Sequence, residues 1–384
     1  MRIFISTGEV SGDLQGALLV EALLRQATLN NTQLEIVALG GDKMQQAGAT
    51  IIGNTAKISS FGLLEAIPYI LPTLQIQQTA IKYLKENPPD LVVLIDYMGP
   101  NMVIGKYVRR HLPNLPIVYY IAPQVWVSSL TTKDTKAIIN VSNKLLAIFP
   151  AEARYFEKHK ANVTWVGHPL IDRMQEFESR EIARQKLGIL DEVTNIALLP
   201  ASRPQELKYL LPVMFETAQT LQEKLEQVHF WIPLSLETYR DRIEKAIQQY
   251  GLKATVVSGQ QKEVLAAADL AITKCGTVNL ELALLKIPQV VLYRLSPFTY
   301  WVGTKILKVT FDYASPVNLV AAKEIVPEFI QERATKENLV QAAMELLLNP
   351  ERKKLLQKDY QEMRASLGEV GVCNRAAKEI LQLL

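Results

Sequence analysis

The sequence lacks the features that mark secreted, membrane-spanning and nucleic-acid-binding proteins. It has two cysteines in 384 residues, Cys275 and Cys373, which match no metal-binding spacing and indicate a reducing compartment. The amino terminus has no charged segment followed by a long apolar one, so we expect no signal peptide. No apolar run approaches the roughly 20 residues that cross a bilayer as a helix. We therefore expect a protein that is soluble or lies on a membrane surface.

The chain also has little net charge and no evident metal site. A formal charge of +3 is too small to favour nucleic acid as a partner, and no dense block of lysine and arginine is interleaved with aromatic residues. No carboxylate or histidine cluster of the Asp-x-Asp kind is present, so we expect neither a metal nor another cofactor. With 48% hydrophobic and 21% charged residues, the chain can bury sizeable cores.

What the chain does have is a repeated alternation of apolar strands and amphipathic helices, which predicts an α/β fold with parallel sheets. A polar, charged stretch at 172–186 divides the alternation into two halves. The length favours two domains. We predict Rossmann-like, doubly wound domains at 1–170 and 171–365. A last helix near 366–384 either packs back on the first domain or exchanges between the subunits of a homodimer. Strands are expected at 35–39, 91–95, 117–121, 144–149, 195–199, 229–233, 254–258, 270–273 and 288–293.

A glycine-rich segment follows the first apolar run. The residues Gly8-Glu9-Val10-Ser11-Gly12-Asp13 precede a helix expected over 14–26. Gly8 suits a positive φ at a sharp turn, Ser11 or Asp13 suits the helix cap, and Gly12 and Gly16 allow close approach of a neighbouring backbone. The Gly-x3-Gly-x3-Gly spacing differs from the dinucleotide pattern, which disfavours a dehydrogenase. The segment is either a ligand-binding turn or the ordinary glycine-rich turn of an α/β protein.

Ligands of open α/β sheets bind beyond the carboxyl ends of the strands, so the residues that follow strands are the candidates. Asp96 follows the most apolar strand of the first half and is either a general base, a ligand for a sugar hydroxyl or an ordinary turn residue. His168 lies at the domain junction, where a structural role is favoured.

The second half offers an anion site after two of its strands. Arg203 follows the strand at 195–199 and can hold a diphosphate through two parallel hydrogen bonds; the alternative is an ion pair with Glu206. Gly276 and Thr277 begin a helix after the strand at 270–273, so their amides face a ligand. Glu281, one turn later, can accept both hydroxyls of a ribose; the alternative is a capped helix with a surface glutamate.

Stretches along nearly the whole chain resemble the bacterial lipid-A-disaccharide synthase family, glycosyltransferases of the GT-B type. Among them are Gly8-Glu9-Val10-Ser11-Gly12-Asp13 and Gly276-Thr277-Val278-Asn279-Leu280-Glu281. The others lie at 40–44, 61–65, 123–126, 149–152, 166–172, 198–203, 316–319, 326–328 and 371–381.

The resemblance implies two Rossmann-like domains that face each other across a cleft, and an inverting hexosyltransferase. The donor would be UDP-2,3-diacylglucosamine and the acceptor 2,3-diacylglucosamine 1-phosphate. The products would be the β-1,6-linked lipid A disaccharide 1-phosphate and UDP. Asp96 would take the proton of the acceptor hydroxyl, and Arg203 would stabilise the departing UDP. The donor residues would be Arg203, Gly276, Thr277, Glu281 and Asn318, and the acceptor residues Gly8, Glu9, Ser11, Gly12, Asp13 and Asn101.

Acylated substrates require a surface that faces a membrane. The apolar stretch 61–74 and the aromatic and lysine-rich stretch 296–308 suit a bilayer interface, although each is also compatible with an ordinary core helix. Together with the implied substrates, they predict a cytoplasmic protein that associates peripherally with the inner membrane.

Three positions depart from the family pattern. Gly99 stands where many relatives carry a second acid, Cys275 replaces the serine of a Ser-Gly-Thr triplet, and Gln15 stands where histidine is common. They keep two alternatives open: a related GT-B transferase or epimerase with another substrate, and a non-catalytic membrane-associated protein that binds a UDP-sugar.

Overall fold

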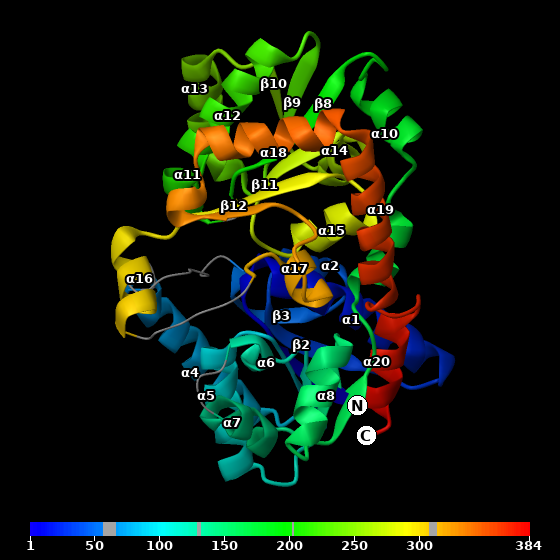
Figure 1. Cartoon of the computed structure of the whole chain (residues 1–384). Coiled ribbons are helices and arrows are strands. Elements are labelled where there is room, and N and C mark those ends of the chain that lie inside the picture. Colours follow the sequence, from blue (N-terminus) through cyan, green and yellow to red (C-terminus); the bar gives the residue numbers. More distant parts are fainter. Residues whose placement is uncertain (57–66, 129–131, 202, 307–312) are drawn as a thin grey trace. The chain divides into compact units, whose positions relative to one another are not determined.

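The computed structural model describes residues 1–56, 67–128, 132–201, 203–306 and 313–384. These residues form two compact units (Figure 1). The first unit consists of Met1–Asp172 and Leu367–Leu384, and the second of Arg173–Ser366. Each unit is built on its own sheet.

The first unit contains, within its described residues, a seven-stranded parallel sheet of order β3-β2-β1-β4-β5-β6-β7. All five residues of β4 are buried, as a strand covered on both faces requires. Its strands are β1 (Arg2–Ser6), β2 (Glu35–Gly40), β3 (Thr50–Asn54), β4 (Leu91–Ile95), β5 (Ile117–Tyr120), β6 (Lys144–Ala147) and β7 (Val163–Trp165).

Helices cover both faces of this sheet. On one face, Phe4, Val92 and Tyr119 pack into a core with residues of α4, α5, α7 and α8. The next residue of β5, Tyr120, points to the other face and lies near Cys373 of α20, which packs beside α1 (Figure 1). The helices are α1 (Glu9–Leu29), α2 (Asp42–Gln46), η2 (Ile67–Tyr69), α4 (Ile70–Glu86), α5 (Met98–His111), α6 (Val125–Ser128), α7 (Lys133–Val141), α8 (Pro150–Lys158), α9 (Leu170–Arg173) and α20 (Val372–Leu381).

The second unit contains, in the part that is described, a six-stranded parallel sheet of order β10-β9-β8-β11-β12-β13. Its strands are β8 (Thr194–Leu199), β9 (Val228–Pro233), β10 (Ala254–Val257), β11 (Leu270–Lys274), β12 (Gln289–Tyr293) and β13 (Glu328–Ile330). Its helices are η3 (Met174–Glu176), α10 (Arg180–Leu187), α11 (Pro204–Tyr209), α12 (Leu211–Lys224), η4 (Glu237–Tyr239), α13 (Arg240–Tyr250), α14 (Gln261–Ala267), α15 (Val278–Leu284), α16 (Pro297–Trp301), η5 (Val302–Ile306), α17 (Pro316–Ala321), η6 (Gln331–Arg333), α18 (Lys336–Leu348) and α19 (Pro350–Ala365).

Both sheets are doubly wound, because the strand order runs outward in both directions from a central pair. The order reverses between β1 and β4 in the first unit, and between β8 and β11 in the second. These reversal points are where open α/β sheets bind ligands. The predicted α/β class with two Rossmann-like, doubly wound domains is therefore confirmed.

The start of the first helix differs from the prediction. Helix α1 begins at Glu9 rather than at residue 14, so Ser11 and Asp13 lie inside it and neither caps it. The N-cap is Gly8, whose φ of −132° is extended rather than positive; the positive φ, 63°, belongs to Glu9. Side chains rather than backbone approach the glycines, since a Cβ on Gly16 would lie 2.5 Å from Met44 Sδ.

Two carboxylates each bind the start of another helix: Asp13 binds the start of α2, and Asp172 binds the start of α20. Asp13 is buried, and its carboxylate accepts hydrogen bonds from the amides of Gly41, Lys43 and Met44 at 2.8–3.1 Å, at the start of α2. Asp172 does the same for α20, accepting from the amides of residues 371–373 at 2.6–3.1 Å. The last helix of this chain is thereby held in the first unit.

Replacing Asp13 with alanine should lower the free energy of unfolding by about 2–3 kcal/mol, because three amides lose a charged acceptor. Asp13→Asn should cost less, since its amide oxygen still accepts. Ser11→Ala, at the other predicted cap position, should stay within about 0.5 kcal/mol of the unmodified chain. Chemical denaturation and hydrogen exchange of the amides at 41–44 measure these effects. An equal loss of unfolding free energy in Asp13→Ala and Ser11→Ala would contradict the structural role of Asp13.

Candidate functional site

The carboxyl end of β4 presents an exposed carboxylate on a strained backbone. Asp96 directly follows β4, its side chain is exposed, and its φ is +47°. Its amide donates to Ile121 O at 3.0 Å. Its carbonyl accepts from Asn101 Nδ2 at 2.7 Å and from Tyr119 Oη at 2.8 Å. The main chain of this exposed residue is thus fixed by three hydrogen bonds.

Other left-handed residues gather at the same edge of the sheet. Tyr97 has a φ of 49°, Ile121, just after β5, one of 57°, and Glu9, after β1, one of 63°. Such conformations cost of order 1–3 kcal/mol each and concentrate at functional sites, and a β-branched residue such as Ile121 adopts them least readily. This strain marks the edge at the reversal point as the candidate site of the first unit.

Most predicted acceptor residues lie behind this edge. Asn101 is fully buried: its Nδ2 also donates to Ile95 O at 3.0 Å, and its Oδ1 accepts from Ser6 Oγ at 2.7 Å. It ties β1 to β4 and supports Asp96. Gly8, Gly12 and Asp13 are buried as well, whereas Glu9 and Ser11 are half-buried and reach the surface.

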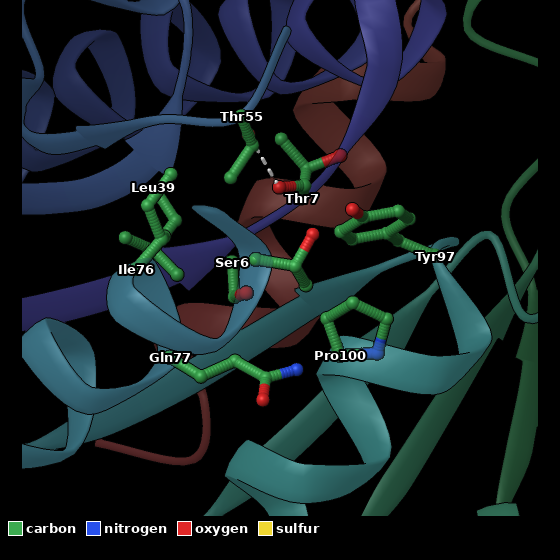
Figure 2. Close-up of a pocket in the computed structure, with 9 residues that line it drawn as sticks. Ser6, Thr7, Leu39, Thr55, Ile76, Gln77, Tyr97 and Pro100 are labelled. Carbon is green, nitrogen blue, oxygen red and sulfur yellow. Dashed lines mark hydrogen bonds between the residues drawn. The ribbon is translucent and has the colours of Figure 1, made fainter. Parts of the chain in front are cut away.

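Tyr97 closes a small gap in the packing at the reversal point (Figure 2). A Cβ on Gly8 would lie 2.4 Å from the Tyr97 ring, so only glycine fits beneath it. Burial raises the pKa of the Tyr97 phenol above its ordinary value. The gap measures about 10 Å³, room for one water at most; it is lined by Ser6, Thr7, Leu39, Thr55, Thr73, Ile76, Gln77, Tyr97 and Pro100. A sugar therefore has to bind outside it.

Two buried titratable groups lie near this edge. Burial raises the pKa of Glu152 to about 8, and the charge of Asp96 adds to the shift; its Oε2 accepts from Ile148 N at 2.8 Å. Sequence reasoning did not propose Glu152, whose position at a helix start is that of a cap. Burial lowers the pKa of His168 to about 3. His168 is therefore neutral near pH 7, which fits the structural role expected of it.

In the second unit, the ends of β8 and β11 carry two cations that share one carboxylate. Arg203 Nη1 lies 3.5 Å from Glu206 Oε1, so the predicted alternative, an ion pair with Glu206, is present. Lys274 Nζ lies 3.9 Å from the same oxygen. Sequence reasoning missed Lys274, although a lysine as last residue of a strand at a reversal point is a detectable signal.

The predicted amide of Gly276 and the neighbouring Cys275 thiol make hydrogen bonds within the protein. Gly276 N donates to Asn279 Oδ1 at 2.8 Å, and Thr277 is the N-cap of α15. Cys275 Sγ contacts Ala314 O at 2.8 Å, and burial raises the pKa of its thiol to about 12. The thiol therefore stays protonated and unreactive.

Glu281 and Asn318 have buried side chains. Glu281 pairs with Arg173, so the alternative of a surface glutamate is wrong. Asn318 Oδ1 accepts from Ile325 N and Val326 N at 2.8 and 3.0 Å. Asn318 Nδ2 donates to Val326 O and Glu328 Oε2 at 2.9 and 3.0 Å. Asn318 thus supports the segment that leads into β13.

Large apolar side chains are exposed in the described parts of both predicted membrane-facing stretches. In the first unit they are Ile67, Ile70, Leu71 and Leu74, and in the second Phe298 and Trp301. Residues 61–66 and 307–308 of these stretches lie outside the described residues, as does the matched segment 61–65.

Within the described ranges, no group of three or more His, Cys, Asp or Glu side chains could hold a metal ion. No helix in that part of the chain combines the length and apolarity needed to cross a bilayer.

Comparisons with solved structures show likeness in fold. The S. aureus MnaA–UDP co-structure has a TM-score of 0.68 at 15% identity and covers 100% of this chain and 97% of its own. Acinetobacter baumannii MurG has a TM-score of 0.56 at 15% identity, covering 99% of each chain. These likenesses confirm the predicted GT-B class.

Comparisons with sequences are more specific. The model of the family described as lipid-A-disaccharide synthetase matches residues 3–383. Lipid-A-disaccharide synthase of Gloeothece citriformis is 59% identical over 99% of both chains. That of Synechocystis is 54% identical over 100% of this chain and 98% of its own. The chain therefore belongs to the lipid-A-disaccharide synthase family.

Proposed function

We propose that the protein transfers 2,3-diacylglucosamine from UDP to 2,3-diacylglucosamine 1-phosphate, forming the β-1,6 lipid A disaccharide 1-phosphate and UDP. It is a hexosyltransferase by its family. The observation that carries the assignment beyond the family is that each doubly wound sheet presents the charge the reaction needs at its reversal point. The first sheet presents the Asp96 carboxylate and the second the Arg203 guanidinium.

In the first unit, Asp96 acts as the general base. Its exposed carboxylate takes the proton of the acceptor 6-hydroxyl, and the oxygen attacks the anomeric carbon with inversion. The fixed main chain of Asp96 holds the base in place without rearrangement during the reaction. Glu9 and Ser11 contact the acceptor sugar directly. The buried acceptor residues, Gly8, Gly12, Asp13 and Asn101, shape the edge on which it lies.

In the second unit, Arg203 stabilises the negative charge that develops on UDP as the bond to the sugar breaks. The loop at Gly276 and Thr277 lies beside the diphosphate. Glu281, held by Arg173, accepts the ribose hydroxyls, and Asn318 contributes by holding residues 325–328.

The departure at Gly99 does not argue for loss of activity. A Cβ added at Gly99 would meet no atom within 4 Å. The position is therefore open, and glycine in place of an acid leaves the packing around it unchanged. The likeness to epimerases extends only to the fold, at 14% identity for the Neisseria meningitidis enzyme.

We also propose that the protein binds the cytoplasmic face of the inner membrane peripherally. Ile70 and Leu71 at the start of α4 are 51% and 70% exposed, and Trp301 of α16 is 53% exposed. Exposed clusters of large apolar residues on a soluble surface mark interaction sites, and a tryptophan suits the headgroup region. Binding there gives the enzyme access to substrates whose acyl chains remain in the bilayer.

Replacing Asp96 with asparagine should lower disaccharide formation by at least about 100-fold, because the base is lost, while UDP affinity stays nearly unchanged. Mass spectrometry of the product and calorimetry with UDP measure the two effects. Asp134→Asn, an exposed carboxylate of the same unit, is the matched control and should be fully active. Normal turnover by Asp96→Asn would remove Asp96 as the base.

The Arg203→Ala variant should bind UDP at least about tenfold more weakly, because the charge-assisted bonds to the diphosphate disappear. Arg203→Lys should recover only part of this affinity, since lysine cannot make two parallel bonds. Arg364→Ala, at an exposed arginine of the same unit, serves as the control. Wild-type affinity in Arg203→Ala would refute the donor site.

The double variant Ile70→Ser, Leu71→Ser should bind anionic lipid vesicles at least about tenfold more weakly, because two apolar side chains no longer enter the interface. Co-sedimentation measures the bound fraction. A matched double variant, Leu190→Ser, Leu355→Ser, removes leucines that are 62% and 51% exposed and should bind like the unmodified protein. If the two double variants lose binding equally, α4 is not the membrane-facing element.

A further inference from the structure

The side chain of Lys274 lies in the donor half of the molecule without a close anionic partner. Lys274 is the last residue of β11, and its side chain is 14% exposed. Its Nζ donates to Cys275 O at 3.4 Å and lies 3.9 Å from Glu206 Oε1. Charge-assisted hydrogen bonds between nitrogen and oxygen are 2.7–2.9 Å long. The ammonium is therefore attracted to Glu206 without being hydrogen-bonded to it.

The same carboxylate also serves Arg203. Glu206 Oε1 lies 3.5 Å from Arg203 Nη1, and Glu206 Oε2 accepts from Arg203 N at 3.1 Å. Glu206 is 2% exposed, so its charge is shared by two cations in surroundings that screen it little. The position of these three residues follows from the sheet, because β8 and β11 are neighbours at the reversal point.

A second carboxylate, that of Glu328, lies near Cys275 but is held by its own loop. Glu328 is close enough to raise the pKa of Cys275. Its own oxygens, however, accept from Ala314 N, Ser315 N and Asn318 Nδ2 at 2.9–3.0 Å. Glu328 is thereby committed to its loop, and Glu206 is the carboxylate that Lys274 and Arg203 share.

Gly276 keeps space for the ammonium. A Cβ added at Gly276 would lie 2.9 Å from Lys274 Nζ. Any side chain at 276 would therefore push the ammonium away from the loop. The glycine thus has a role besides that of its amide: it lets the lysine lie over the turn between β11 and α15.

We propose that Lys274 is a second cationic ligand of the sugar nucleotide's diphosphate, beside Arg203, and that Glu206 holds both cations in position until the diphosphate binds. The inference rests on the proposed donor site in the second unit. Both cations lie within 4 Å of Glu206 Oε1, at the edge where a ligand of this sheet binds. A diphosphate, with at least two negative charges, can contact both cations and bring an oxygen within hydrogen-bonding distance of Lys274 Nζ, whereas Glu206 Oε1 lies 3.9 Å from it.

The test is calorimetric titration of the full chain with UDP, UMP and uridine. Lys274→Met keeps the length of the side chain and removes its charge. Its affinity for UDP should fall about tenfold, its affinity for UMP should fall less, and its affinity for uridine should not change. Lys274→Arg should bind UDP within about threefold of the unmodified protein. Lys354→Met, at an exposed lysine of the same unit, is the matched control and should change nothing.

Glu206→Gln supplies a second, independent measurement. Without the competing negative charge, its affinity for UDP should rise severalfold while that for uridine stays the same. Unchanged UDP affinity in Lys274→Met would overturn the role of Lys274 and leave the proposed transferase standing. Equal losses of UDP and uridine affinity would also overturn it, because they indicate a structural role. If the unmodified chain binds no UDP, the donor site itself is refuted, and Lys274 with it.

Discussion

The reversal of strand order within each parallel sheet is the constraint on which the rest of the structure depends. The strand order reverses at β1/β4 and at β8/β11, and open α/β sheets bind ligands beyond the carboxyl ends of strands at such a point. The residues that follow these strands are the ones a ligand can reach. Asp96 follows one strand of the first pair, and Arg203 and Lys274 lie at the ends of the second. A ligand at these points can be contacted by side chains at the surface, whereas the other parts of the sheets are covered by helices.

A second feature recurs in both units: a carboxylate that accepts hydrogen bonds from backbone amides of another segment. Asp13 serves α2, Asp172 serves α20, and Glu328 serves residues 314 and 315. Each satisfies amides that would otherwise be unpaired in the interior, which is costly. Acidic residues therefore have a structural role here that does not involve a ligand. The carboxylates left for chemistry are those that remain accessible, and Asp96 is exposed.

The sequence is sufficient to predict the class of fold and the edges where the sites lie, because apolar strands, their length and the residues that follow them are local features. It is not sufficient to assign roles to side chains whose partners are distant in the chain. Asp13 was predicted to cap its own helix, yet the amides that donate to its carboxylate lie 28–31 residues away. Asn101 was predicted to contact a ligand, and in the structure its side chain also accepts a hydrogen bond from Ser6, 95 residues away. Lys274 was not predicted as a site residue, because Glu206, which lies close to it in the structure, is distant in the sequence.

In the proposed reaction, the acidic and the basic groups lie on different sheets. A displacement at a sugar carbon needs a proton removed from the attacking hydroxyl and negative charge accepted on the leaving diphosphate. A carboxylate serves the first need, and a cation beside it would stabilise the charged carboxylate and weaken it as a base. Cations serve the second, and an exposed carboxylate among them would repel the diphosphate. With Asp96 after a strand of one sheet and Arg203 and Lys274 at the ends of strands of the other, each group has surroundings that favour the role proposed for it. Glu206 is buried and lies within 4 Å of both cations, so its charge is compensated by theirs.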